Sequence, residues 1–168
     1  MDEYLVDTNI LFDMMHPNAA HNKEVWKNRR TRNAILHLPV IVLGETQLGF
    51  HLGGIDLDAA RRDLDVFLDR NGLILQQATK HTAQIYGDIK ARLIEKYSSK
   101  KTKHRAKWPE RWSDPVTGAD LGIDECDLWI VAQAIERNFV LVTADKMDRL
   151  RAVIIDLRVE NWRVASAP

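Results

Sequence analysis

Short apolar runs alternate with longer amphipathic stretches along this chain. Five runs have the length and composition of buried strands, and they cover residues 4–6, 38–43, 72–75, 139–142 and 152–155. Strands that are apolar throughout, without alternating polar residues, are typical of a parallel sheet covered by helices on both faces. We therefore predict a central parallel sheet.

Three stretches between these runs have the periodicity of amphipathic helices. Residues 56–70, 79–97 and 124–137 each repeat apolar side chains at intervals of three and four positions, which places those side chains on one helical face. Strands that alternate with helices form βαβ units with right-handed crossovers. The predicted fold class is α/β, a three-layer α/β/α arrangement around a central parallel β-sheet, and 168 residues fit a single domain over residues 1–168.

Four acidic residues stand near the ends of these predicted elements. Asp7 ends the first run, Glu45 follows the second at the start of the next helix, and Asp145 follows the fourth. Asp127 lies in the first turn of the helix that leads to the fourth run. Because ligands of open parallel sheets gather beyond the carboxyl ends of the strands, we expect these four carboxylates to meet in one site.

A group of four carboxylates requires a cation, because two like charges about 4 Å apart repel by roughly 4 kcal/mol at an intermediate dielectric constant. Ligands that are all oxygen select Mg²⁺ or Mn²⁺ rather than zinc. An ion of this kind activates water and neutralises charge on a phosphate. The predicted chemistry is therefore hydrolysis of phosphodiester bonds.

The aspartates also have a structural interpretation. Asp7 and Asp124 have the sequence context of helix N-caps, Asp127 that of a capping-box partner, and Asp145 could cap a short helix that follows it. Glu45 has no such role, and an unpaired carboxylate between apolar runs is costly. Taken singly, capping is favoured for the aspartates, whereas four acids at four element ends favour a shared site. The two roles are compatible.

Five segments carry motifs that occur together in one known family. They are residues 5–11 (LVDTNIL), 40–49 (VIVLGETQLG), 126–134 (CDLWIVAQA), 141–145 (LVTAD) and 159–162 (VENW). In this order the segments resemble the sequence blocks of PIN domains, particularly the VapC-type toxins of bacterial and archaeal toxin–antitoxin pairs. No single block is specific, but the ordered set spans residues 4–162.

The resemblance implies an endoribonuclease that depends on Mg²⁺ or Mn²⁺, is neutralised by a cognate antitoxin protein and forms a homodimer. Its catalytic and metal-binding residues would be Asp7, Glu45, Asp127 and Asp145. Polar support would come from Asn9 and Thr143, and two nearby acids that could replace or assist a ligand are Asp124 and Asp148. The chain departs from the family pattern at Leu43-Gly44, where a small hydroxyl residue often precedes the acid, and at Cys126, where asparagine is frequent.

Residues 98–122 form a further departure, because this stretch is longer than in compact relatives and begins as a basic loop or insertion. Residues 98–113 contain six Lys or Arg and one acid, a net charge of +5. The predicted RNA-binding residues are Lys100, Lys101, Lys103, Arg105, Lys107, Trp108, Arg111 and Trp112. The cations would hold phosphates and the indoles would stack on unpaired bases. A solvated loop is the alternative, as a solvated helix face is for a second basic cluster at residues 21–33.

The composition excludes other kinds of site. Lys+Arg and Asp+Glu number 24 each, so the total charge gives no indication of a nucleic-acid partner. The single cysteine, Cys126, excludes an internal disulfide and a cysteine-rich zinc site. The sequence has no Gly-rich phosphate loop, no signal-like segment and no apolar run of roughly 18 residues. We expect a cytoplasmic protein without membrane contact.

The first hypothesis is therefore a metal-dependent endoribonuclease toxin with RNA as its substrate. One alternative is a nuclease of the same fold that acts in RNA processing or on DNA. Another is an RNA-binding module without catalysis, against which the presence of all four acids argues.

Overall fold

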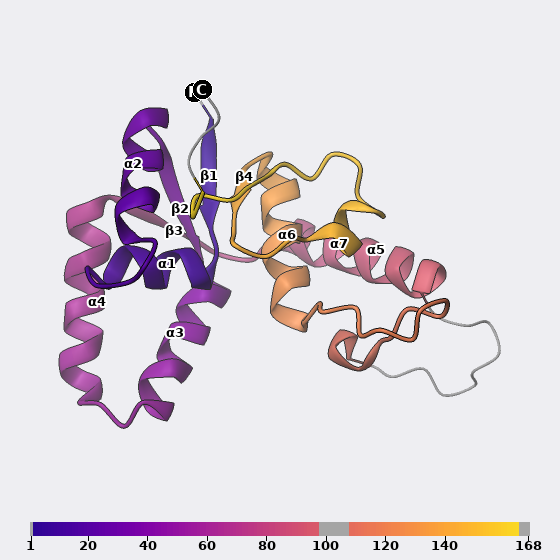
Figure 1. Ribbon diagram of the computed structural model, residues 1–168, viewed down its shortest axis with the longest axis horizontal. Coiled ribbons are helices and arrows are strands. Elements are labelled where there is room, and N and C mark those ends of the chain that lie inside the picture. Colours follow the sequence, from indigo (N-terminus) through magenta and orange to yellow (C-terminus); the bar gives the residue numbers. More distant parts are fainter. Residues whose placement is uncertain (1, 98–107, 165–168) are drawn as a thin grey trace.

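A parallel sheet forms the middle layer of the protein (Figure 1). The computed structural model describes residues 2–97 and 108–164. Within them the strands are β1 (Glu3–Val6), β2 (Ile35–Pro39), β3 (Leu73–Gln76), β4 (Val140–Val142) and β5 (Val159–Glu160). The strand order is β3-β2-β1-β4-β5, and every neighbouring pair is parallel. The predicted three-layer α/β/α fold with a central parallel sheet is confirmed.

Helices cover both faces of this sheet. They are α1 (Thr8–Met15), α2 (Asn22–Arg32), α3 (Val40–Leu52), α4 (Leu57–Asn71), α5 (Lys80–Tyr97), α6 (Glu125–Arg137), α7 (Asp148–Arg151) and the 3₁₀ turn η1 (Pro109–Arg111). The chain moves from β1 to β2 and β3 in one direction along the sheet, and then to β4 and β5 in the other. Right-handed crossovers therefore place α1–α4 on one face and α5–α7 on the other, as Figure 1 shows.

The three predicted helices are present, with ends that local chemistry explains. Asp56 caps α4 by accepting hydrogen bonds from the backbone N–H groups of Asp58 (3.0 Å) and Ala59 (3.1 Å). Gly72 ends the same helix with a φ of 59°, a left-handed conformation that glycine adopts without steric cost. Within the described residues, no helix is long and apolar enough to cross a membrane.

The predicted strand at residues 38–43 is wrong. Strand β2 begins at Ile35 and ends at Pro39, and α3 begins at Val40. The apolar run contains the end of a buried strand followed by the first turn of a helix, and uniform hydrophobicity does not distinguish the two. Glu45 consequently lies in the second turn of α3 and not at its start.

The predicted strand at residues 152–155 is also wrong. These residues follow α7, with Ile154 buried and Ile155 96% exposed, so the run does not cross the covered sheet. The fifth strand is β5, which pairs with β4 through Leu141 and Val159. Asp145 caps no helix, because α7 begins three residues later and Met147 occupies its N-cap position.

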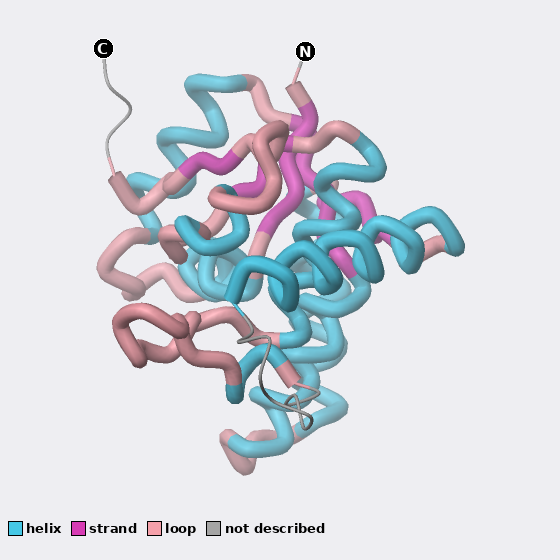
Figure 2. Tube along the Cα trace, turned by 90° about the vertical axis from the view of Figure 1, so that its right-hand side faces the viewer, coloured by secondary structure: helices cyan, strands magenta, loops and turns pink. Residues whose placement is uncertain are grey.

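The core lies around the central strand β1 and its neighbour β4. Leu5 and Val6 of β1 and Leu141 and Val142 of β4 have no exposed surface. Figure 2 views the molecule from the α5 side and shows the strands behind a layer of helices. The carboxyl ends of β1 and β4 lie side by side, with Val6 opposite Val142. This register sets the position of the acidic residues that follow both strands.

Candidate active site

A cleft of about 410 Å³ lies at the carboxyl ends of β1 and β4. Its lining consists of Asp7, Thr8, Asn9, Phe12, Glu45, Asp124, Asp127, Ile130, Asp145 and Arg163. The four acids predicted to be catalytic thus line a single cavity, although they are separated by up to 138 positions in the sequence. Asn9, which was predicted as a polar support, and Asp124, which was predicted as an acid that could replace or assist a ligand, line it as well.

Asp7 is the most enclosed of these acids, with 5% of its surface exposed. It follows β1 directly and caps α1, because its Oδ1 accepts a 2.7 Å hydrogen bond from the backbone N–H of Thr8. Its Oδ2 accepts from the hydroxyl of Thr143 (2.6 Å) and from the amide of Asn9 (2.9 Å). Burial raises the pKa of Asp7, the hydrogen bonds from Thr143 and from the backbone of Thr8 oppose the shift, and the charges of Asp145 and Glu45 raise the pKa further.

Asn9 and Thr143 connect Asp7 with Asp145. The side-chain amide of Asn9 donates to Oδ2 of Asp145 (3.0 Å) as well as to Asp7, and its Oδ1 accepts from the backbone N–H of Ala144 (3.0 Å). The hydroxyl of Thr143 accepts from the backbone N–H of Asp145 (3.0 Å). These bonds fix the segment after β4 against the first turn of α1. Both residues therefore contact the acids that the sequence predicted they would support.

Asp127 and Asp124 form a capping box at the start of α6. The backbone N–H of Asp127 donates to Oδ1 of Asp124 (2.8 Å), and the backbone N–H of Asp124 donates to Oδ2 of Asp127 (2.9 Å). Burial, followed by the charges of Asp124, Asp7 and Asp145, raises the pKa of Asp127 to about 7, against the effect of its backbone hydrogen bond. Asp127 is thus a cap and a cleft acid at once.

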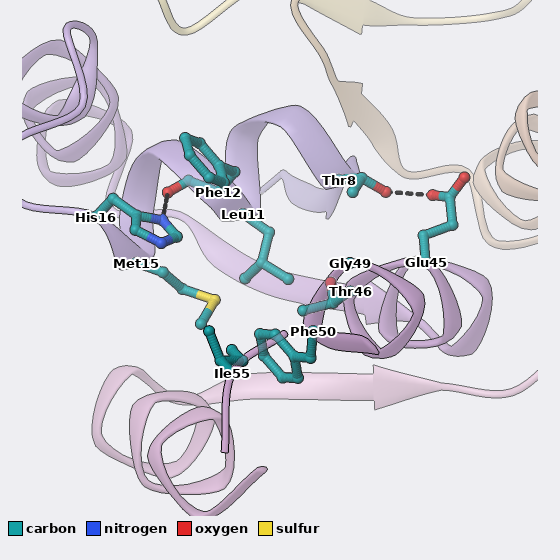
Figure 3. Close-up of a pocket in the computed structure, with 10 residues that line it drawn as sticks. All are labelled: Thr8, Leu11, Phe12, Met15, His16, Glu45, Thr46, Gly49, Phe50 and Ile55. Atoms are coloured by element: carbon teal, nitrogen blue, oxygen red, sulfur yellow. Dashed lines mark hydrogen bonds between the residues drawn. The ribbon is translucent and has the colours of Figure 1, made fainter. Parts of the chain in front are cut away.

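Glu45 reaches the cleft from α3, where its Oε2 accepts a hydrogen bond from the hydroxyl of Thr8 (Figure 3). Cys126 lies against Glu45, and burial together with that carboxylate raises the pKa of the Cys126 thiol to about 12. The thiol is therefore neutral and is no ligand for a hard cation. The role of Thr8 was missed from the sequence, although Thr8 stands between Asp7 and Asn9 in the first motif.

The donor chemistry of the cleft suits a hard divalent cation. Within residues 2–97 and 108–164, no three His, Cys, Asp or Glu side chains are placed so that they could hold a metal ion as they stand. However, the acids offer only oxygen atoms, which Mg²⁺ and Mn²⁺ prefer. Oδ1 of Asp127 and Oδ1 of Asp145 accept no hydrogen bond from any described residue. Burial is the largest cause of the raised pKa values of Asp7 and Asp127, and the neighbouring carboxylates add to it, so a bound cation would stabilise the charged form of both.

A second, polar pocket of about 260 Å³ shares Asp127 and Asp145 with the cleft. Asp148, the first residue of α7, lines this pocket together with Lys146 and Arg149. Asp148 does not line the cleft itself. The structure thus places this predicted assisting acid beside the other four and not among them.

A third pocket, of about 320 Å³ and largely apolar, lies between α1 and α3 (Figure 3). Its apolar lining comes from Leu11, Phe12 and Met15 of α1, from Gly49 and Phe50 of α3, and from Ile55. It shares Thr8, Phe12 and Glu45 with the acidic cleft. The two cavities therefore form one continuous surface, with an acidic end and an apolar end.

The predicted RNA-binding loop lies partly outside the described residues, since Lys100, Lys101, Lys103, Arg105 and Lys107 fall within residues 98–107. Trp108 and Arg111 are exposed at η1, whereas Trp112 is half-buried and packs against the core. Glu110 accepts a 2.9 Å hydrogen bond from the backbone N–H of Glu125. This bond attaches η1 to the first turn of α6, the helix that carries Asp127.

The fold and the cleft together define an α/β protein with a carboxylate site at the carboxyl ends of the neighbouring strands β1 and β4. The family model for the PIN domain matches residues 4–153, and the chain belongs to that family. VapC-type members of the family are nucleases, which agrees with the chemistry predicted for the four acids.

Solved structures with the same fold include three complexes. VapBC2 from Rickettsia felis, bound to a DNA fragment from its promoter, has a TM-score of 0.67 and 24% identity, covering 95% of this chain and 98% of that chain. VapBC-1 from nontypeable Haemophilus influenzae has a TM-score of 0.65 and 21% identity, with coverage of 96% and 99%. FitAcB from Neisseria gonorrhoeae has a TM-score of 0.59 and 20% identity, with coverage of 95% and 97%. No match was found among curated proteins.

Proposed function

We propose that this protein is an endoribonuclease that requires Mg²⁺ or Mn²⁺, and that it is the toxin of a VapBC-type toxin–antitoxin module. The observation that carries the proposal is the meeting of Asp7, Glu45, Asp127 and Asp145 in one cleft. Two of these acids have raised pKa values because of burial and mutual repulsion. Titratable groups whose pKa values are shifted by burial and by neighbouring charges are a typical feature of a functional site.

Asp7, Glu45, Asp127 and Asp145 would hold the ion, and Asp124 of the same cleft and Asp148 of the adjoining pocket would assist them. When bound, Mg²⁺ or Mn²⁺ would activate water and offset the charge that develops on the phosphate. The chain itself keeps its acids in position. Asn9 and Thr143 fix Asp7 and Asp145, and Asp124 fixes Asp127 through the capping box. Residues locked in this way before the substrate arrives need no reorganisation during the reaction.

RNA is the proposed substrate because an exposed indole and an exposed guanidinium lie on a segment that is hydrogen-bonded to the first turn of α6. Trp108 and Arg111 lie at η1, which Glu110 attaches to the helix of Asp127. An exposed indole can stack on an unpaired base, and unpaired bases are more frequent in RNA than in duplex DNA. Residues 98–122 are thus proposed as a substrate-binding insertion of a single domain.

An antitoxin protein is the proposed partner. The structural neighbours are described as VapBC complexes, and the apolar pocket between α1 and α3 opens beside the acids. A partner segment with an apolar side chain in this pocket would cover Glu45 and Thr8 and so block the cleft. We also propose a homodimer, which sedimentation of the purified protein would test.

The first experiment compares cleavage of a mixed RNA pool in Mg²⁺, Mn²⁺ and EDTA. The wild type is compared with Asp127→Asn, which keeps an oxygen for the hydrogen bond from Asp124, and with Asp65→Asn as a matched control on the exposed face of α4. We expect divalent-dependent cleavage that falls by about 100-fold or more in Asp127→Asn and is unchanged in Asp65→Asn.

Parallel digestion of DNA oligonucleotides tests the nuclease alternative, since cleavage of DNA alone would exclude the ribonuclease. Binding of RNA without cleavage in any divalent ion would support the non-catalytic module instead. Growth arrest on expression, relieved by the product of an adjacent gene, would support the toxin assignment. The absence of growth arrest would count against the toxin and leave the nuclease standing.

A further inference from the structure

Among the described residues that line the acidic cleft, Arg163 alone is basic. It lies in the segment after β5, one residue beyond the last motif recognised in the sequence. Its guanidinium contacts the backbone of the site, because Nη2 donates to the carbonyl oxygen of Asn9 at 3.3 Å. Asn9 is the residue whose side chain joins Asp7 to Asp145. Arg163 is thus hydrogen-bonded to the residue that connects two of the cleft acids.

The guanidinium of Arg163 is held by a buried acid that belongs to α1. Nε donates to Oδ2 of Asp13 at 2.6 Å, and the Asp13 side chain is 4% exposed. Among the described residues Asp13 is the only carboxylate paired with Arg163, so the guanidinium is not paired with Glu45, Asp127 or any other cleft acid. Nη1 donates to no described residue. Nε and Nη2 of the guanidinium are therefore held by hydrogen bonds, while Nη1 is available to donate to a ligand.

The backbone on either side of Arg163 is fixed as well. The side-chain amide of Asn28, which is 1% exposed, donates to the carbonyl oxygens of Trp162 (3.0 Å) and Val164 (2.9 Å). The indole of Trp162 is fully buried, and its Nε1 donates to Oε2 of Glu160 (2.8 Å). A buried amide and a buried indole together hold the segment that presents Arg163 to the cleft.

A purely structural ion pair would account for only part of this arrangement. A buried Asp13 needs a partner, because an unpaired charge in the interior is strongly destabilising. A lysine could meet that need as a point charge, whereas the planar guanidinium can bind Asp13 with one edge and an anion with another. A cationic side chain is also useful in the cleft itself, because a phosphodiester must approach four carboxylates there.

We propose that Arg163 is a substrate-positioning residue whose guanidinium binds a phosphate of the nucleic-acid strand in the acidic cleft, with Asp13 holding it in orientation. This proposal rests on the proposed nuclease function and adds a phosphate-binding position to it. The phosphate would receive a charge-assisted hydrogen bond, while the fixed guanidinium would lose little conformational freedom on binding.

The test measures binding of a fluorescein-labelled single-stranded RNA by anisotropy, in Ca²⁺ and across a series of KCl concentrations. The variants are Arg163→Lys and the double variant Arg163→Met with Asp13→Asn, which removes both charges so that no buried carboxylate is left unpaired. Arg62→Met, on the exposed face of α4, is the matched control. Thermal unfolding of each variant confirms that it is folded.

We expect the double variant to bind the RNA about tenfold more weakly, with the salt slope of log K lowered by about 0.7, the value for one phosphate contact on a single strand. Arg163→Lys should keep the salt slope, because it keeps the charge. In RNA cleavage with Mg²⁺ it should raise KM more than it lowers kcat. Arg62→Met should match the wild type. A structural role alone would change the unfolding temperature without moving the salt slope.

The outcomes separate this proposal from the function on which it rests. If the wild type binds and cleaves RNA while the double variant keeps the wild-type affinity and slope, the role of Arg163 is refuted and the nuclease stands. If the wild type neither binds nor cleaves RNA, the nuclease proposal fails and the role of Arg163 fails with it. If the double variant does not fold, an unchanged KM in Arg163→Lys refutes the positioning role.

Discussion

The hydroxyl of Thr143 donates a 2.6 Å hydrogen bond to Oδ2 of Asp7, and both side chains are buried. The bond joins the residue after β1 to the residue after β4. The same hydroxyl accepts from the backbone N–H of Asp145, so a single oxygen atom orients two of the cleft acids. The parallel pairing of Val6 with Val142 places the two segments at the same level. The geometry of the site is therefore a direct consequence of strand register.

Replacing Thr143 with valine removes this donor and keeps the shape of the side chain. Asp7 then loses a hydrogen bond in a buried position, which should lower the free energy of unfolding by about 1–3 kcal/mol. Affinity for Mn²⁺ should fall by about 10–100-fold, because a ligand loses the group that orients it. Urea unfolding and calorimetric titration with Mn²⁺ measure the two effects.

Thr143→Ser is the matched control, since it keeps the hydroxyl and removes only a methyl group. We expect the serine variant to retain Mn²⁺ affinity within a fewfold of the wild type. Equal Mn²⁺ affinity in the valine variant would show that the hydroxyl does not orient a ligand.

The sequence predicted the fold well where element ends are marked by local chemistry. The helix at residues 124–137 was correct because Asp124 and Asp127 form the capping box that their spacing indicates. The strand at residues 38–43 was wrong because nothing in an all-apolar run marks the change from strand to helix at Val40. An apolar run favours burial, but tertiary packing decides which of its residues are buried and in which element they lie.

The acids of the cleft were predictable for a different reason. Asp7, Asp127 and Asp145 stand at element ends, and parallel topology brings such ends together. Arg163 was not predictable in this way, because no periodicity, cap or spacing marks it. Its position depends on the burial of Trp162 and on Asn28, which lies 135 positions away in the sequence. Contacts of this kind are visible only in three dimensions.

The stability of the metal-free protein should fall as pH rises. The pKa of Asp127 is about 7 in the folded chain, against 3.8 for an ordinary aspartate, and the pKa of Asp7 is raised as well. A raised pKa means that the folded state binds the proton more tightly than the unfolded state. The stabilisation is therefore complete below about pH 4 and is lost as pH rises through about 7. Asp114 and Glu136 have lowered pKa values, so their contribution changes only in more acidic solution.

The unfolding temperature measured in EDTA between about pH 5 and 8 checks this prediction. We expect a decrease across that range for the wild type and a smaller one for Asp127→Asn, which has no proton to lose at that position. Saturating Mn²⁺ should also reduce the decrease, because a cation replaces the protons. A temperature that is constant or rises with pH in EDTA would contradict the predicted repulsion.

Asp124 offers a way to separate capping from metal binding. Asp124→Ala should lower the free energy of unfolding by about 1 kcal/mol, because α6 loses its N-cap. Asp124→Ser keeps a capping oxygen and removes the charge, so stability should stay near that of the wild type. Loss of the Asp124 charge should also lower the pKa of Asp127, to which it contributes.

The cleavage rate of the serine variant decides the role of Asp124. We expect the rate to remain within about tenfold of the wild type, because Asp7, Glu45, Asp127 and Asp145 are all retained. A loss as large as that in Asp127→Asn would instead identify Asp124 as a fifth ligand. Thermal unfolding of the same sample distinguishes a lost ligand from a lost cap.

Gly49 gives access to the proposed partner site without touching the acids. It lies on α3 at the wall of the apolar pocket, and a Cβ atom built there meets no other atom within 4 Å. Gly49→Ala should therefore be tolerated and raise helix stability by about 0.5–1 kcal/mol.

Gly49→Met should place a long apolar side chain in the pocket and exclude the partner segment. Cleavage of RNA by both purified variants should equal that of the wild type. On expression with the product of the adjacent gene, cells with Gly49→Ala should grow and cells with Gly49→Met should arrest. Growth in both would place the antitoxin elsewhere on the surface, whereas arrest in the methionine variant alone would assign the α1–α3 pocket to it.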